Sequence, residues 1–341
     1  MKKLRAAIIG CGVIGPTHAS VLADLENATL VAVCDVVPEK AQKLADQYHC
    51  AAYTDFHEML KRDDIDVVHV TVPSGMHADI GIEAAKAGKH VVVEKPIDIS
   101  LKKADALIQA CKAAGVKLCS ISQHRFDPGI VQLKKAAMEG KLGQLNFGGS
   151  HTKWYRSQEY YDSGDWRGTW KLDGGGALMN QSIHYVDMLQ YIMGPVEELY
   201  AYTATRAHER IEVEDIAVAS LRFASGAIGI IEGNTAAYPG FCARLDIYGN
   251  DGSVIIENDK IIEWKFKDES QPAIDPSDVK SIAGSSSAEI WTNGHQRQLQ
   301  EAYMAFQEGR DPAVTGEEGR KPLAIVLAIY ESARTGKTVK L

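Results

Sequence analysis

Residues 6–15, Ala-Ala-Ile-Ile-Gly-Cys-Gly-Val-Ile-Gly, decide the fold of this chain. The apolar residues at the start predict a short buried strand, and a helical segment follows from about residue 16 to about residue 25. Between them lies a GxGxxG turn. Its glycines permit a tight turn and the close approach of a pyrophosphate, while the helix N-terminus attracts the phosphate charge. The turn therefore predicts a dinucleotide-binding site with these contacts: Gly10, Gly12, Val13, Ile14 and Gly15.

The next strand, residues 29–34, ends in Asp35, twenty residues after Gly15. A carboxylate at this place bonds the ribose hydroxyls of NAD and repels the 2′-phosphate of NADP. The sequence therefore indicates NAD rather than NADP as the cofactor, with Asp35 and Val36 as further contacts. A glycine turn in some other α/β domain would not explain this acidic residue.

Strands and helices continue to alternate up to residue 123, with strands expected at residues 67–72, 90–96 and 117–123. This order predicts an α/β domain over residues 1–123, a Rossmann-type doubly wound parallel sheet. Ligands bind at the carboxyl ends of such strands. Ser74, His77 and Gln123 follow or close strands there, so they are candidate cofactor contacts; Ser74 and His77 could equally be a turn residue and a helix cap.

The stretch His90-Val91-Val92-Val93-Glu94-Lys95-Pro96 holds the candidate catalytic residue. Its β-branched residues predict a buried strand, and Glu94 and Lys95 stand at the carboxyl end as cofactor contacts. Pro96 disfavours helical dihedrals at Lys95 and so stiffens its backbone. A lysine has an ordinary pKa of about 10.4, and burial or a nearby positive charge can lower it enough for the amine to act as a base. The alternative is a solvent-exposed lysine that ends a strand.

From residue 144 the pattern changes to longer strands with polar interruptions, expected at residues 145–155, 197–207, 215–223, 227–236, 243–249 and 253–257. Strands that follow one another with few helices predict an α+β domain with a large, mostly antiparallel, open sheet. We assign residues 124–341 to this second domain, which binds the substrate. A sheet face without covering helices needs a partner, so we expect a homodimer or a homotetramer.

Aromatic residues gather in residues 154–170, where three tryptophans and three tyrosines are interleaved with charged side chains. Ring faces pack on the C–H surfaces of a carbohydrate while polar groups bind its hydroxyls. An aromatic minicore beneath a long loop is the other interpretation. As substrate contacts we select Arg125, Tyr155, Arg156 and Trp170.

A triple-glycine turn at residues 174–176 opens a helix expected to reach about residue 193. Asn180, His184 and Asp187 recur on it at positions i, i+4 and i+7, so they share one face. Polar residues on an otherwise apolar helix are costly unless they face a site or one another. His184 is therefore a candidate catalytic residue, and Asn180 and His184 are candidate substrate contacts.

Composition excludes several classes of protein. The formal net charge of -8 argues against a nucleic-acid partner. The six cysteines have neither CxxC nor metal-ligand spacing, which predicts reduced core residues and no metal. The apolar run after Lys2, Lys3 and Arg5 is interrupted by glycines, unlike a signal peptide, and no stretch is long enough to cross a bilayer. We therefore expect a cytoplasmic protein without a membrane partner.

At the glycine turn, at Glu94-Lys95-Pro96 and at residues 174–184 together, the chain resembles the Gfo/Idh/MocA oxidoreductases, the family of glucose-fructose oxidoreductase and inositol dehydrogenase. The resemblance covers nearly the whole chain. It implies an enzyme that oxidises or reduces a secondary alcohol of a sugar or cyclitol with a nicotinamide cofactor. It also implies that Lys95 is the catalytic lysine and His184 the active-site histidine, and that Trp166-Arg167 contacts the cofactor.

One position departs from the family pattern, because Asn180 stands where many members carry an aspartate four residues before the histidine. An amide cannot raise the basicity of His184 as a carboxylate would, so Lys95 is the better candidate for the general base. The surrounding pattern resembles members that act on pyranosides or nucleotide sugars, often at the C3 hydroxyl. We expect an NAD-dependent dehydrogenase for a sugar, glycoside or nucleotide sugar. An inositol dehydrogenase and a non-catalytic NAD-sensing regulator stay open as alternatives.

Overall fold

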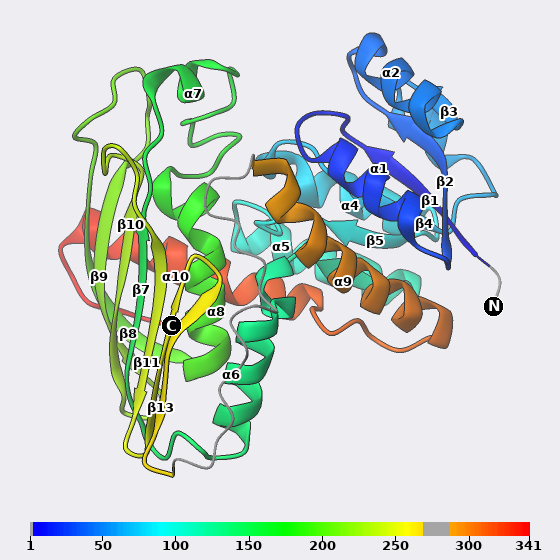
Figure 1. Ribbon diagram of the computed structural model, residues 1–341. Coiled ribbons are helices and arrows are strands. Elements are labelled where there is room, and N and C mark those ends of the chain that lie inside the picture. Colours follow the sequence, from blue (N-terminus) through cyan, green and yellow to red (C-terminus); the bar gives the residue numbers. More distant parts are fainter. Residues whose placement is uncertain (1–2, 269–286) are drawn as a thin grey trace. The chain divides into compact units, whose positions relative to one another are not determined.

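The computed structural model describes residues 3–268 and 287–341, which form two compact units (Figure 1). Unit 1 contains residues 3–123 and residues 287–320, and unit 2 contains residues 124–268 and 321–341. The second domain expected from the sequence, residues 124–341, differs from this division because the chain returns to unit 1 at helix α9 (Ser287–Glu308).

The sheet of unit 1 has six parallel strands in the order β3-β2-β1-β4-β5-β6. They are β1 (Leu4–Ile9), β2 (Ala28–Cys34), β3 (Ala51–Tyr53), β4 (Val67–Val70), β5 (His90–Val93) and β6 (Leu118–Ser120). This is the strand order of a dinucleotide-binding Rossmann fold, whose ligand site lies at the carboxyl ends where the order reverses, between β1 and β4. The predicted doubly wound parallel sheet is confirmed.

The helices of unit 1 connect these strands, and α9 adds a further layer. The connecting elements are α1 (Gly15–Asp24), α2 (Pro38–Tyr48), α3 (Phe56–Leu60), η1 (Ser74–Met76), α4 (His77–Lys86) and α5 (Leu101–Ala114). On α9, Leu299, Ala302, Tyr303 and Phe306 have the i, i+3, i+4, i+7 spacing of one helical face. They join the buried core around α1 and β1, which explains why this late segment belongs to the first unit.

Unit 2 is built on an eight-stranded sheet in the order β13-β12-β11-β7-β10-β9-β8-β14. Its strands are β7 (Leu145–Lys153), β8 (Val196–Ala204), β9 (Ile216–Phe223), β10 (Ile228–Asn234), β11 (Ala243–Gly249), β12 (Gly252–Glu257), β13 (Lys260–Phe266) and β14 (Val339–Lys340). β7 and β10 pair in parallel, and the other neighbours pair antiparallel. The expected large, mostly antiparallel sheet is therefore confirmed, although β13 and β14 were not expected.

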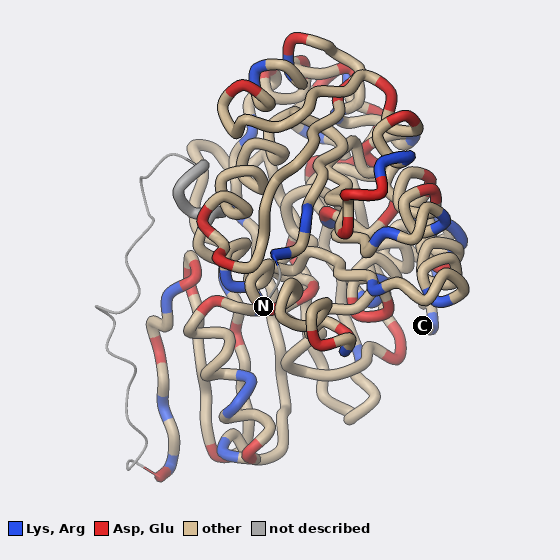
Figure 2. The backbone as a smooth tube through the Cα atoms, turned by 90° about the vertical axis from the view of Figure 1, so that its right-hand side faces the viewer, with Lys and Arg blue, Asp and Glu red and all other residues tan. Residues whose placement is uncertain are grey.

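The remaining elements are η2 (Gln123–Phe126), α6 (Pro128–Met138), α7 (Gln158–Asp162), η3 (Ala177–Ser182), α8 (Ile183–Met193) and α10 (Gly316–Thr335). α8 packs against β7 and β11, while alternate residues of β9 are buried and exposed. None of the described helices has the length and apolar character needed to cross a membrane. All six cysteines are free thiols. Figure 2 shows basic residues interspersed with acidic ones along the chain.

An ion cluster lies on the sheet of unit 2. The ring of His151 on β7 faces two carboxylates, with Nδ1 3.1 Å from Glu232 Oε2 on β10 and Nε2 3.5 Å from Asp246 Oδ2 on β11. Asp246 also accepts a 2.9 Å hydrogen bond from Arg244 Nε. Hydrogen bonds to Asp246 and Glu232 raise the pKa of His151 to about 9.

This cluster predicts a pH-dependent contribution to stability. The folded-state pKa lies above the unfolded value of about 6.5, so the contribution is complete below that pH and is lost as the pH rises through 9. We expect His151→Gln to lower the free energy of unfolding by up to about 3 kcal/mol at pH 6 and by much less at pH 10. Urea titrations of both proteins at the two pH values measure the difference. A loss that is the same at both would contradict the assignment.

Candidate active site

The glycine turn between β1 and α1 has the shape of a phosphate cradle. A Cβ atom on Gly10 would meet the backbone of Thr71, and one on Gly15 would meet the carbonyl of Gly10. Gly10 also has a φ of +102°, which favours glycine. A Cβ on Gly12, in contrast, would have no protein atom within 4 Å. The packing of the described chain therefore requires glycine at positions 10 and 15 but leaves open space at position 12, where a ligand can approach the backbone.

Asp35 lies directly against this turn. Its Oδ2 accepts a 2.7 Å hydrogen bond from the Cys11 amide, and its Oδ1 accepts a 2.9 Å bond from the Val37 amide. Val13 in the turn and Val36 after Asp35 expose 83% and 86% of their surface. No side chain in the described structure caps the N-terminus of α1. Open amides, a carboxylate and exposed apolar side chains together fit the phosphates, ribose and adenine of a dinucleotide.

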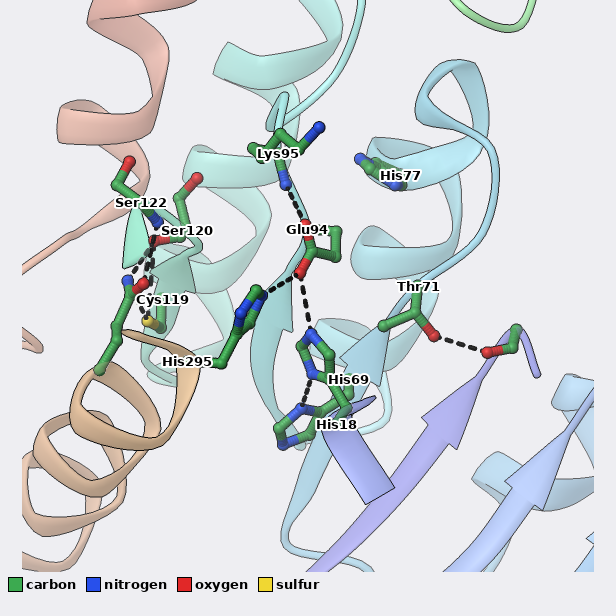
Figure 3. Close-up of polar contacts among 12 residues, drawn as sticks. His18, His69, Thr71, His77, Glu94, Lys95, Cys119, Ser120, Ser122 and His295 are labelled. Carbon is green, nitrogen blue, oxygen red and sulfur yellow. Dashed lines mark hydrogen bonds and ion pairs between the residues drawn. The ribbon is translucent and has the colours of Figure 1, made fainter. Parts of the chain in front are cut away.

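The end of β5 holds Lys95 in a stiff polar setting (Figure 3). Glu94 is buried, and its Oε2 accepts a 3.0 Å hydrogen bond from the Lys95 amide. Its Oε1 lies 2.9 Å from His18 Nε2 and 2.9 Å from His295 Nε2. Lys95 itself is half-buried. A buried carboxylate therefore holds the backbone amide of Lys95 in place.

His77 braces the same loop from the other side. Its Nδ1 lies 2.6 Å from the Pro96 carbonyl and its Nε2 2.9 Å from the Val72 carbonyl, so it connects the segment after β4 with the segment after β5. Burial lowers its pKa, although the two carbonyls act in the opposite direction. Ser74 is buried in η1 nearby in sequence. The structure thus gives His77 a bracing role, and its cofactor contact stays a prediction.

Gln123 is the last residue of the first segment of unit 1, and its side-chain amide lacks a hydrogen-bond partner among the described residues. The side chain is buried, and within the described residues neither its Nε2 nor its Oε1 has a hydrogen-bond partner. Leaving such a group unpaired costs about 1 to 3 kcal/mol. A polar ligand such as a carboxamide would satisfy both atoms, which supports the predicted cofactor contact.

In unit 2, the triple-glycine turn leads into a π-helical turn, η3, before α8 begins. Glu214 accepts hydrogen bonds from the amides of Gly176 (3.0 Å) and Leu178 (2.9 Å), and a Cβ on Gly176 would overlap the Glu214 backbone. The π turn changes the helical period. Asn180 lies in this π turn, whereas His184 and Asp187 lie three residues apart in α8, the spacing of neighbours on one helical face. The shared face of all three residues stays a prediction.

The residues that contact Asn180 and His184 were not predicted from the sequence. Asn180 Nδ2 donates a 2.8 Å bond to Asp173 Oδ1, and the buried ring of His184 packs edge-on to His124 at 5.0 Å between centroids. His124 Nδ1 in turn lies 2.7 Å from Asp127 Oδ2 and 3.5 Å from Asp259 Oδ1. The i, i+3 spacing of His124 and Asp127 was the available signal. Asp259 comes from a hairpin between β12 and β13 that the sequence did not reveal.

Arg125 forms an ion pair inside unit 2, and its contact with the substrate stays a prediction. It is buried, and its Nε and Nη2 bond both carboxylate oxygens of Asp187 at 2.8 and 2.6 Å. Its guanidinium also stacks 4.5 Å from the ring centre of Tyr191. This bidentate ion pair ties η2 to α8 and explains Asp187 without a ligand.

The aromatic segment combines both interpretations offered for it. Tyr161 is buried and bonds Thr235, as a minicore would require. Tyr155 and Trp170, however, expose 36% and 46% of their surface. Tyr160 is the centre of the cluster, with its hydroxyl 2.7 Å from Arg167 Nη1 and 2.9 Å from Gln181 Nε2, while the guanidinium of Arg156 lies 5.3 Å from its ring centre. Arg167 also stacks on Trp166 at 4.5 Å.

A Rossmann sheet with this glycine turn and Asp35, followed in the same chain by an open-sheet unit that carries a buried histidine, defines a nicotinamide-dependent oxidoreductase. Residues 4–122 match the family model described as "Oxidoreductase family, NAD-binding Rossmann fold". Residues 130–255 match the GFO/IDH/MocA C-terminal domain. The chain belongs to the Gfo/Idh/MocA oxidoreductase family.

Similar proteins and solved structures are named as dehydrogenases. Myo-inositol 2-dehydrogenase of Thermotoga maritima is 30% identical, over 99% of this chain and 98% of its own. The crystal structure of the WlbA dehydrogenase from Bordetella pertussis, in complex with NADH and UDP-GlcNAcA, is 35% identical and covers 100% of this chain and 99% of its own, with a TM-score of 0.89. A structure of levoglucosan dehydrogenase with NADH and L-sorbose has a TM-score of 0.86 at 23% identity and covers 100% of this chain and 99% of its own, so it shows the fold alone.

Proposed function

We propose that this protein transfers hydride between NAD and a secondary alcohol of a nucleotide sugar, at C3 of the pyranose ring. The observation that carries this proposal is the placement of Lys95 at the carboxyl end of β5, in the sheet whose glycine turn and Asp35 fit the dinucleotide. The nucleotide sugar is supported by the 35% identical WlbA dehydrogenase, whose structure contains UDP-GlcNAcA. An inositol is the second candidate, because a myo-inositol dehydrogenase is 30% identical over 99% of the chain.

In this mechanism Lys95 accepts the hydroxyl proton, and His184 orients the same oxygen. Bound NAD accepts the hydride. The amide of Lys95 is fixed by Glu94, and the ring of His184 is held against His124. A positioned acid–base group of this kind typically contributes about 10² to 10⁴ in rate.

Asn180 fits this site better than the aspartate found in many relatives. Its Nδ2 donates to Asp173 at 2.8 Å, so an aspartate here would bring two carboxylates into contact. Like charges at this distance raise a pKa strongly and would leave one carboxyl protonated. Asp173 thereby fixes which way the Asn180 amide points and supports its role as a substrate contact. Contacts of the substrate with Tyr155, Arg156 and Trp170, and of the cofactor with Trp166 and Arg167, stay predictions.

We also propose that the protein forms a homodimer or a homotetramer and that it lies in the cytoplasm. The exposed side chains of Tyr202, Val218, Ile228 and Ile230 on β8, β9 and β10 support association through the sheet of unit 2. Mass measurement by light scattering would test the oligomer.

The substrate class is tested by comparing kcat/KM for UDP-GlcNAcA and for myo-inositol with saturating NAD. We expect the nucleotide sugar to be at least about 100-fold better, because a site built to bind a charged nucleotide rejects an analogue that lacks it by leaving polar groups unpaired. A preference of similar size for myo-inositol would favour the second candidate.

A further inference from the structure

Glu94 lies at the end of a buried series of hydrogen bonds that joins four segments of unit 1; Figure 3 shows the part around Glu94, His18, His69 and His295. Tyr303 on α9 has its hydroxyl 2.8 Å from His69 Nε2 on β4. His69 Nδ1 lies 2.8 Å from His18 Nδ1 on α1, and His18 Nε2 lies 2.9 Å from Glu94 Oε1. His295, also on α9, reaches the same oxygen at 2.9 Å. Each of these side chains is at most 5% exposed.

The protonation states of these side chains determine which group donates each hydrogen bond. Burial lowers the pKa of His18 and His69, so each ring is neutral and carries one N–H. Burial acts to raise the pKa of Glu94, but hydrogen bonds from His18 and His295 outweigh it and keep that pKa well below the ordinary value. An ionised carboxylate only accepts hydrogen bonds. Tyr303 therefore donates to His69, His69 to His18, and His18 to Glu94.

The distances in this cluster argue against a metal site. His18, Glu94 and His295 are a possible set of zinc ligands. Their 2.9 Å separations are hydrogen-bond distances, however, whereas ligand atoms at the corners of a zinc tetrahedron lie about 3.3 Å apart. At its other end the series of hydrogen bonds reaches the hydroxyl of Tyr303, which is fully buried.

We propose that Glu94, His18 and His295 are positioning residues for Lys95. The two histidines hold the Glu94 carboxylate in one orientation, and its Oε2 then fixes the peptide plane of Lys95 through the 3.0 Å bond to the Lys95 amide. His69 and Tyr303 fix the tautomer in which His18 donates to Glu94. This inference rests on the proposed function, in which Lys95 is the general base.

Two replacements of His295 test the role. His295→Leu removes the donor and His295→Gln keeps an N–H of similar reach. We expect His295→Leu to lower kcat by about 10- to 100-fold, since a misplacement of 1 Å can cost about 10² in rate. The KM for the sugar and the Kd for NADH should change less than about 3-fold, and His295→Gln should recover most of kcat. A merely structural role would lower stability without this separation of kcat from KM.

His90→Leu is the matched control, because it replaces another histidine of unit 1, on the strand β5 that leads to Glu94. His90 accepts a 3.0 Å bond from the Lys117 amide and stacks on Phe306, at the opposite end of β5 from Glu94. It should lose stability but keep kcat. If His295→Leu does not fold, Glu94→Gln at saturating NAD and sugar replaces it, with the same expected fall in kcat.

The outcomes separate this inference from the proposed function. Wild-type kcat in His295→Leu or Glu94→Gln, together with a large loss in Lys95→Met, would overturn the positioning role and leave the base in place. Wild-type kcat in Lys95→Met would overturn the base itself. A loss of kcat in His295→Leu that His295→Gln does not relieve would also contradict the role of the donated hydrogen bond.

Discussion

Replacing Lys95 with methionine is expected to lower kcat by about 10² to 10⁴ while the protein still folds and binds NADH. Methionine keeps the length and the apolar part of the side chain but removes the amine. The large effect follows because Lys95 takes the hydroxyl proton, while His184 only orients the oxygen. Stopped-flow measurement of NADH formation with saturating substrate determines the rate of the chemical step.

Lys86→Met supplies the control for this substitution. Lys86 ends α4 in the same unit, and its side chain is largely exposed and paired with Glu83 at 2.8 Å. An exposed pair of this kind contributes little to stability, so the variant should behave as wild type. Turnover near the wild-type value in Lys95→Met would show that another group accepts the proton, and His184 would then be the next candidate.

Replacing Gly12 with alanine is expected to weaken NADH binding by about 10- to 100-fold, which corresponds to about 1.4 to 2.8 kcal/mol. A Cβ at this position meets no protein atom within 4 Å, so the fold should tolerate it. The added methyl group would instead occupy the space through which the pyrophosphate approaches the backbone. Fluorescence titration with NADH measures the affinity, and thermal unfolding of the free protein should be nearly unchanged.

Gly15→Ala is the contrasting variant. Its Cβ would overlap the carbonyl of Gly10, so it should lower the unfolding temperature as well as the affinity. Wild-type affinity for NADH in Gly12→Ala would contradict the assignment of this turn as the cofactor cradle.

The first unit could be predicted well because its signals are local. Strand, glycine turn and helix follow one another within residues 6–25, and Asp35 closes the pattern. The return of α9 could not be predicted in the same way. Its apolar face shows in the spacing of residues 299, 302, 303 and 306, but nothing in that spacing names α1 as the partner. The buried donors to Glu94 could not be predicted either, because His18 and His295 come from segments far from Glu94 in the sequence.

The second unit was predicted in outline but not in detail. The open sheet was predicted from strands that follow one another with few helices. β9 shows the regular alternation of buried and exposed residues, whereas β13, which was not predicted, has no buried residues and lacks that alternation. Residues 177–193 were read with one helical period, and the π turn of η3 changes that period before His184. The group formed by His124, Asp127 and Asp259 could not be predicted, because folding brings Asp259 to His124 and Asp127 from a distant part of the sequence.

The most direct measurement is the absorbance of reduced nicotinamide when the wild-type protein is mixed with NAD and a panel of nucleotide sugars, glycosides and inositols. We expect NADH formation with at least one nucleotide sugar, at a rate that Lys95→Met lowers by about 10² to 10⁴. Binding of NADH without turnover of any compound in the panel would contradict this expectation and favour a protein that senses NAD without catalysis.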